Sequence, residues 1–240
     1  EITRRRKKQS MSKHINTPTI TSVSEDGDNT ATFVIEPMHG GYGMTLGNSI
    51  RRVLLSSISG AAITSFRIEG ATHEFTAIDG MKEDVVDIMQ NLKNVRFKMF
   101  SEEPQTLSIE KKGAGPVTAK DIKTNADVEV VNTDQHIATL DNSKTTFKGE
   151  IIVEVGRGYQ HIDNTVAKAS SDFITLDAIF SPVQRVRYNV EKTRVGQNTD
   201  LDKLSVTVTT DGSIEPQDAF EEANAIGLDW VATKQSQNGW

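Results

Sequence analysis

Cysteine is absent from the 240 residues, and this absence excludes several classes of protein. A chain without cysteine cannot form disulfides, thiolate metal sites or a cysteine nucleophile, and it suits a reducing cytoplasm. Long apolar runs are also missing, since none approaches the roughly 20 residues that a membrane-spanning helix needs. The remaining composition, 36% hydrophobic and 25% charged residues, is ordinary for a globular protein with a buried core.

An excess of positive charge is missing as well, because the formal net charge is -6. Binding to phosphates normally requires a clustered positive excess, so a domain that mainly grips nucleic acid is disfavoured and a protein partner fits better. A run of five basic residues stands at residues 4–8, within a segment, residues 1–13, that we interpret as a flexible basic tail. A weak contact of this tail with phosphate or RNA stays open. Because the chain begins with Glu1, we expect the natural start either upstream or at Met11, and the sequence leaves both open.

Signatures of catalysis and metal binding are equally scarce. Gly41, Gly43 and Gly47 precede an expected helix, as in dinucleotide-binding loops, but Leu46 stands where the third glycine of that fingerprint belongs. The five histidines are scattered, so no local spacing indicates a metal site. We therefore expect no catalytic residue, no metal ligand and no cofactor in this chain.

The most informative segment, residues 36–57, reads EPMHGGYGMTLGNSIRRVLLSS and joins a strand end, a glycine-rich turn and an amphipathic helix. If the helix begins near Thr45 and each residue turns by about 100°, it has an apolar side and an opposite side that carries arginine. The apolar side gathers Leu46, Ile50, Val53, Leu54 and Ser57, and the opposite side gathers Asn48, Arg52 and Leu55. Arginine beside leucine suits contact with another subunit, because the guanidinium fork donates hydrogen bonds in a fixed geometry. A solvated Arg51-Arg52 pair on an ordinary helix is the alternative.

Apolar alternation predicts a strand at residues 31–36, just before this helix in the chain, and Pro37 is expected to end the strand. Gly60 is expected to end the helix, and a second strand is expected at residues 63–68. The turn at Asp79-Gly80 then leads into a second helix.

The second helix has a charge pattern that complements the helix dipole. Its acidic residues, Glu83, Asp84 and Asp87, lie near the start and are expected to face water, whereas Lys93 lies near the end. Its expected apolar stripe consists of Val85, Ile88, Met89 and Leu92. Short β-branched runs then predict a β-rich region between residues 102 and 155.

The last third of the sequence predicts two strands and a helix. The strands are expected at residues 186–191 and 204–209, and Pro216 is well placed in the first turn of the helix. The apolar side of that helix would gather Ala219, Ala223, Ile226 and Trp230.

The segment at residues 36–57 resembles the start of the bacterial RNA polymerase alpha subunit. It matches the family pattern of Glu-Pro, Gly-Tyr-Gly, Thr-Leu-Gly-Asn-Ser, Arg-Arg and Leu-Leu-Ser-Ser almost without interruption. Further matches follow in chain order, among them AIFSPV at residues 178–183 and RVGQNTDLDKL at residues 194–204. Because the resemblance covers residues 30–226, chance similarity is not a serious competitor.

This resemblance implies an α+β fold with a discontinuous dimerisation domain, an antiparallel sheet plus two helices, at residues 14–59 and 182–235. A mostly β domain, residues 60–181, would be inserted between the two segments. The first and last helices would meet a second copy across a two-fold axis, which requires self-complementary apolar faces. The residues expected in this contact are Leu46, Ile50, Val53, Leu54, Phe220 and Ala223.

The resemblance also implies a function: a non-catalytic subunit of a DNA-directed RNA polymerase that dimerises and then assembles the two large catalytic subunits. One protomer would hold the beta subunit through Asn48, Arg51, Arg52 and Leu55. The other would hold the beta-prime subunit through Lys93, Asp177, Ala178 and Phe180. The catalytic magnesium is expected in a partner subunit. The expected location is the bacterial cytoplasm, within nucleoid-associated polymerase, with a plastid as the alternative.

Family members usually continue through a flexible linker into a DNA-binding carboxy-terminal domain, whereas this sequence stops at Trp240 after the linker-like residues 233–239. We therefore expect no direct sequence-specific DNA contact from these residues. Two other classes remain open. An enzyme with an unfamiliar site would turn over a substrate, and a basic-tailed nucleic-acid-binding module would lose salt-sensitive DNA binding when the tail is deleted.

Overall fold

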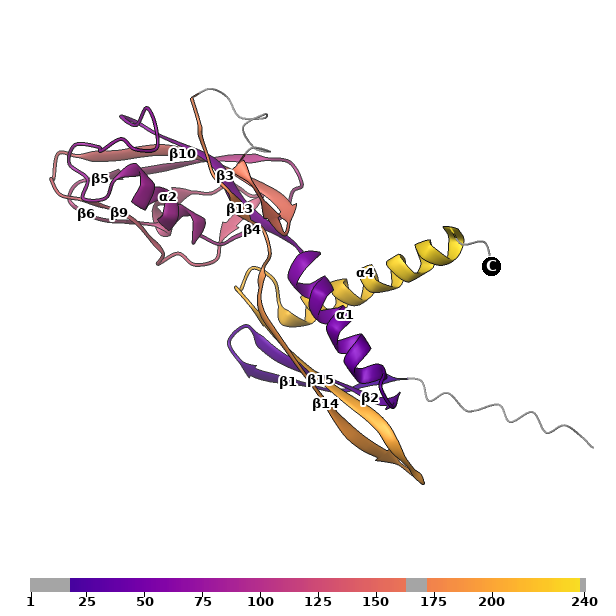
Figure 1. Cartoon of the computed structure of the whole chain (residues 1–240). Helices are drawn as coiled ribbons and strands as arrows, with labels where there is room; N and C mark the ends of the chain where they lie inside the picture. The colour runs from indigo at the N-terminus through magenta and orange to yellow at the C-terminus, as the bar shows by residue number, and fades with distance from the viewer. Residues whose placement is uncertain (1–17, 163–171, 238–240) are drawn as a thin grey trace, which may run out of the picture.

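Helices and antiparallel sheets form two parts, each with a hydrophobic core of its own (Figure 1). The computed structural model describes residues 18–162 and 172–237, with side chains up to residue 227. One core draws on residues 31–58 and 183–226, from both ends of the chain, and the other draws on residues 61–176. The α+β class with an inserted β-rich part is therefore confirmed.

The first part is a four-stranded antiparallel sheet with two helices. Its strands, in sheet order, are β1 (Thr19–Gly27), β2 (Thr30–His39), β15 (Asn198–Thr210) and β14 (Val183–Val195). The helices α1 (Tyr42–Ser56) and α4 (Pro216–Gln237) contact the sheet and each other. Phe33 from β2 stacks on Phe220 from α4, with ring centroids 4.1 Å apart. Figure 1 shows that the second half of α4 extends away from the sheet.

The second part is built around a seven-stranded sheet. Its strands are β3 (Ser59–Ile68), β4 (Phe97–Met99), β5 (Gln105–Lys112), β7 (Ile122–Lys123), β8 (Val128–Val130), β10 (Thr146–Arg157) and β12 (Ile174–Thr175). The smaller pieces are α2 (Val85–Lys93), β6 (Gly115–Thr118), the 3-10 turn η1 (Ala119–Asp121), β9 (His136–Leu140), β11 (Tyr159–Gln160) and β13 (Ala178–Ile179). The β-rich prediction for this region is confirmed.

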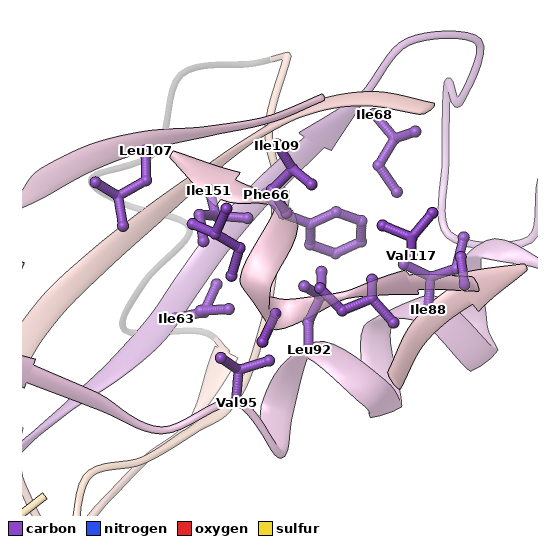
Figure 2. Packing of buried hydrophobic residues seen from close by; sticks show 14 of the residues in the cluster. Ile63, Phe66, Ile68, Ile88, Leu92, Val95, Leu107, Ile109, Val117 and Ile151 are labelled. Carbon is purple, nitrogen blue, oxygen red and sulfur yellow. The ribbon is translucent and has the colours of Figure 1, made fainter. Parts of the chain in front are cut away.

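The apolar face of α2 closes the core of the second part. Figure 2 shows Ile88 and Leu92 from α2 directed toward Phe66 and Ile151 of the sheet. The predicted stripe is confirmed, with Val85, Ile88 and Leu92 buried and Met89 packed at the edge of the cluster. The helix start is also as predicted, because the Asp84 carboxylate accepts a hydrogen bond from the Asp87 amide at 2.8 Å.

Two boundaries near the first helix differ from the prediction. Strand β2 continues past Pro37 to His39, since the pairing of β2 with β15 is irregular between Asp202 and Leu204, opposite Pro37. Proline is tolerated where a ladder is interrupted in this way. Gly60 does not end α1 but lies in β3, where a Cβ atom would stand 1.9 Å from the Phe180 carbonyl oxygen. Gly60 is therefore required by a close approach of two backbones.

The helix at the end of the chain begins as predicted and runs further than predicted. Pro216 is its first residue, and Ala219 and Ala223 are buried. The helix continues to Gln237, so the linker interpretation is wrong for residues 233–237. The predicted basic tail, residues 1–13, and the side chain of Trp230 lie outside the described residues.

Candidate protein interface on helix α1

Helix α1 lies unusually close to strands β14 and β15. It begins at Tyr42, three residues earlier than predicted, so Gly43 and Gly47 lie inside the helix. A Cβ atom at Gly43 would stand 2.7 Å from Val190 Cγ1, and one at Gly47 would stand 2.7 Å from Tyr188 Cδ2. Gly43, expected in the turn before the helix, and Gly47, within the expected helix, both allow the helix to approach the sheet.

A carboxylate from β15 caps the N-terminus of α1. Asp202 Oδ2 accepts hydrogen bonds from the Gly41 amide at 2.7 Å and the Gly43 amide at 3.1 Å. Lys192 Nζ donates to Asp202 Oδ1 at 3.1 Å and to Asp200 Oδ1 at 2.7 Å. Burial acts to raise the pKa of Asp202, but the hydrogen bonds from Lys192, Gly43 and Gly41 outweigh burial and hold the pKa below its usual value. A negative charge therefore sits at the positive end of the helix dipole.

The C-terminal end of α1 is fixed by packing. Leu54 and the following Ile58 are fully buried in the core of the first part. Ser181 Oγ donates a hydrogen bond to the Leu55 carbonyl at 3.2 Å. The helix is thus held at both ends, and its outward face has a defined direction.

The residues predicted for the beta subunit are gathered on that outward face, with one exception. Asn48, Arg51 and Arg52 are exposed, whereas Leu55 is half-buried and packs against the core of the first part. Within the described part of the chain, neither the Arg51 nor the Arg52 guanidinium has an ion-pair partner. Two adjacent guanidiniums are therefore available to acceptors on another molecule.

The residues predicted for dimerisation lie mainly inside the chain's own core. Ile50, Leu54, Phe220 and Ala223 are at most 6% exposed and belong to the core of the first part. Leu46 and Val53 are half-buried at its edge. The four buried side chains thus hold α1 and α4 to the sheet. A role for the six residues in pairing two copies stays a prediction.

Of the residues predicted to contact the beta-prime subunit, two are partly exposed and two are buried. Lys93 Nζ and the Asp177 carboxylate form an ion pair between the end of α2 and the segment before β13. The hydrogen bond from Lys93 holds the pKa of Asp177 below its usual value, despite partial burial. Ala178 and Phe180 are each 2% exposed and pack together with Ala62. These two side chains therefore support the local structure.

An exposed apolar pair beside these residues was missed in the sequence. Tyr159 and Ile179 are cross-strand partners in the β11–β13 ladder and are 60% and 54% exposed. Alternation could have identified Ile179, because it stands between Ala178 and Phe180, whose side chains point to the other side. The Tyr159 hydroxyl donates to Asp177 Oδ2 at 3.5 Å. We call Tyr159, Ile179 and the Lys93–Asp177 pair the insert patch.

Glu83 differs from the prediction that the acidic residues before α2 face water. It receives hydrogen bonds from the Thr139 amide at 2.6 Å and the Thr139 hydroxyl at 2.9 Å. Its Oε1 lies 3.0 Å from His136 Nε2. Burial acts to raise the pKa of Glu83, but these hydrogen bonds outweigh it and lower the pKa. Glu83 therefore fastens the start of α2 to β9.

Among the described side chains, at residues 18–162 and 172–227, no three His, Asp or Glu residues are grouped so that they could hold a metal ion. In the same residues, no helix is long and apolar enough to cross a membrane.

Comparison with known proteins gives a family for both parts of the chain. Residues 66–181 match the family model described as the RNA polymerase Rpb3/RpoA insert domain. The DNA-directed RNA polymerase subunit alpha of Desulforamulus reducens is 51% identical over 207 residues, which are 85% of this chain and 65% of that protein. The subunit of the same name from Oenococcus oeni is 47% identical over 211 residues, 87% of this chain and 67% of the relative.

A third relative, from Oceanobacillus iheyensis and also named DNA-directed RNA polymerase subunit alpha, is 53% identical over 188 residues. That match covers 78% of this chain and 60% of the relative. The chain therefore spans about two thirds of the length of the relatives that it matches, 60 to 67% in these three.

Proposed function

The chain belongs to the family of DNA-directed RNA polymerase alpha subunits, and from this membership we propose that it serves as the assembly subunit of such a polymerase. In this proposal two copies pair, and the pair holds the beta and beta-prime subunits. The observation that carries it is the outward face of α1, Asn48, Arg51 and Arg52, on a helix fixed at both ends. Arginines at the centre of a protein interface are frequent hot spots.

The insert patch supports a second contact, which we assign to the beta-prime subunit. It combines a half-buried ion pair, Lys93–Asp177, with the exposed apolar side chains of Tyr159 and Ile179. Tyrosine is enriched in protein interfaces because it offers a large apolar area and a hydroxyl group. In this contact the beta-prime subunit would meet Tyr159 and Ile179 together with the neighbouring Lys93–Asp177 pair. Ala178 and Phe180 would stay buried and would not touch the partner.

Pairing of two copies is supported by the shape of the first part. The second half of α4 extends beyond the sheet, where a second copy could pack against it (Figure 1). Leu46 and Val53 are partly exposed on the neighbouring helix. A two-fold contact through these helices would use the same surface on both protomers.

We further propose that catalysis and its magnesium ion belong to a partner subunit, and that the chain works in the bacterial cytoplasm. In this assignment the residues of the chain bind and orient the large subunits without taking part in nucleotide transfer.

The test is to purify the chain, determine its mass in solution by light scattering, and then mix it with the beta subunit from the same source. We expect a dimer that captures beta, and an Arg52→Ala variant that remains dimeric but captures far less. The matched control is Arg187→Ala, which removes another exposed arginine, from β14. Failure of the native chain to capture beta would contradict the assembly function.

A further inference from the structure

Helix α1 can present its arginines at a fixed angle only if its first turn is anchored, and its own sequence supplies no anchor. The residue before the helix is Gly41, with no side chain to cap the free amides, and the first turn carries no acidic residue. The last turns are held differently, through the buried Leu54 and the hydrogen bond from Ser181 to Leu55. Any anchor of the first turn must therefore come from elsewhere in the chain.

The β14–β15 hairpin supplies this anchor. Asp202, only 2% exposed, receives the Gly41 and Gly43 amides on one carboxylate oxygen and Lys192 on the other. A buried carboxylate is costly unless donors surround it, and here three donors do so. Gly43 has no space for a Cβ atom, because Val190 Cγ1 would lie 2.7 Å from it. The first turn is thus held against both strands by a specific contact.

We propose that Asp202 is a positioning residue for the docking face of α1, acting through the Gly41 and Gly43 amides to set the direction of Asn48, Arg51 and Arg52. The inference rests on the proposed assembly function. Without the Asp202 contact, the helix would pivot about its other anchor, the buried Leu54 and the Leu55 carbonyl that Ser181 holds. The arginines lie between the two anchors, so their position depends on both.

The test compares Asp202→Asn with Asp200→Asn in the full-length chain. Both substitutions remove one negative charge beside Lys192, but the Asp200 side chain is 85% exposed and makes no hydrogen bond to α1. Amide hydrogen exchange at residues 41–46 is measured in each variant, together with the affinity for the beta subunit. We expect Asp202→Asn to exchange faster in the first turn and to bind beta about tenfold more weakly, a common loss when a hydrogen bond to a charged group is removed. Asp200→Asn should match the native chain in both measurements.

A variant with a general loss of stability separates positioning from folding. Val208→Ala truncates a buried residue of the same strand, on the core side, without touching the Asp202 contact. At a comparable fall in melting temperature, Val208→Ala should keep its affinity for beta, whereas Asp202→Asn should lose it. Equal losses in the two variants would overturn the inference, as would unchanged exchange at residues 41–46 in Asp202→Asn.

Two safeguards keep the inference distinct from the proposed function. If Asp202→Asn does not fold, Lys192→Met replaces it, because this variant removes only the cation from the same carboxylate. It should show a smaller acceleration of exchange at the same amides, and unchanged exchange would overturn the inference.

If the native chain does not bind beta at all, the proposed function fails. In that case faster exchange confined to residues 41–46 still supports the Asp202 anchor, and its absence overturns the anchor too.

Discussion

The β-rich part and helix α1 of the other part differ in how their charged side chains are used. In the β-rich part, charges pair with one another: Arg67 with Glu150 at 2.7 Å, and Lys111 with Asp121 at 2.9 Å. On α1 of the other part, Arg51 and Arg52 are exposed and unpaired within the described residues. Adjacent unpaired arginines on a helix anchored at both ends are the basis of our proposal that this surface meets another subunit.

The largest predicted effect concerns the separate cores of the two parts. Phe220→Ala removes a fully buried ring that stacks on Phe33, and it should lower the free energy of unfolding by about 3–5 kcal/mol. Phe66→Ala, also fully buried, is the matched variant in the β-rich part. Urea unfolding followed by hydrogen exchange should assign each loss to its own part. If both variants destabilised both parts equally, the two parts would not have separate hydrophobic cores.

A somewhat smaller effect is expected at the junction between the parts. Gly60→Ala would place a Cβ atom against the Phe180 carbonyl oxygen, and the backbone must move to relieve the contact. We expect a loss of about 3 kcal/mol, at the upper end of the range for overpacking, measured by thermal unfolding. Gly227→Ala, in α4 with nothing within 4 Å, is the control and should stabilise the helix by up to about 1 kcal/mol. A tolerated Gly60→Ala would refute the close backbone approach.

The internal charges of the β-rich part can be tested through Glu83. Glu83→Gln removes the negative charge and replaces one of the two carboxylate oxygens that face His136 and Thr139 with an amide group that cannot accept, and it should cost about 1.5–3 kcal/mol at pH 7. The pKa of Glu83 is lowered in the folded chain, so the carboxylate stabilises the fold above its unfolded pKa, and this contribution is lost as the pH falls through the folded pKa. The difference between native and variant should therefore shrink in acid. Urea titrations between pH 7 and pH 3 check this, and a constant difference would contradict it.

The smallest effect is expected for a surface ion pair. Arg67 and Glu150 are each more than 40% exposed, so solvent screens their attraction. Arg67→Met should change the free energy of unfolding by less than about 1 kcal/mol, and added salt should reduce the difference further. Denaturation at two salt concentrations measures both. A large, salt-independent loss would mean that this pair matters more to the β-rich part than its exposure suggests.

Most of the secondary structure could be predicted from local patterns. The alternation around Phe33, the stripe through Ile88 and Leu92, and the proline that starts α4 each depend on residues close in sequence. Errors arose where a distant segment determined the local structure. Gly43 and Gly60 have their roles because β14 and the Phe180 carbonyl approach them, and no periodicity reveals such contacts.

The features of the candidate site also separate into those set by residues close in sequence and those set by distant segments. Helical spacing predicts the exposure of Asn48 and Arg52, but it also places Leu55 on the outward side, where the structure has it half-buried. The anchoring by Asp202 joins residues about 160 positions apart, since Gly41 and Gly43 lie in another segment, and it depends on strand pairing that the sequence does not show. Phe220 and Ala223 fit an apolar helix face equally well whether that face meets its own sheet or a second copy. The folded chain shows both side chains packed in its own core, and their role in pairing two copies stays a prediction.

The central claim, that the outward face of α1 is kept for a partner, is tested most directly by the affinity of the beta subunit for two variants. Arg52→Ala and Arg187→Ala each remove one exposed arginine, and calorimetry at one salt concentration compares them with the native chain. We predict that Arg52→Ala loses 2 kcal/mol or more of binding free energy, on the order of a hot-spot residue, while Arg187→Ala loses little. Equal affinity of the two variants would contradict the claim.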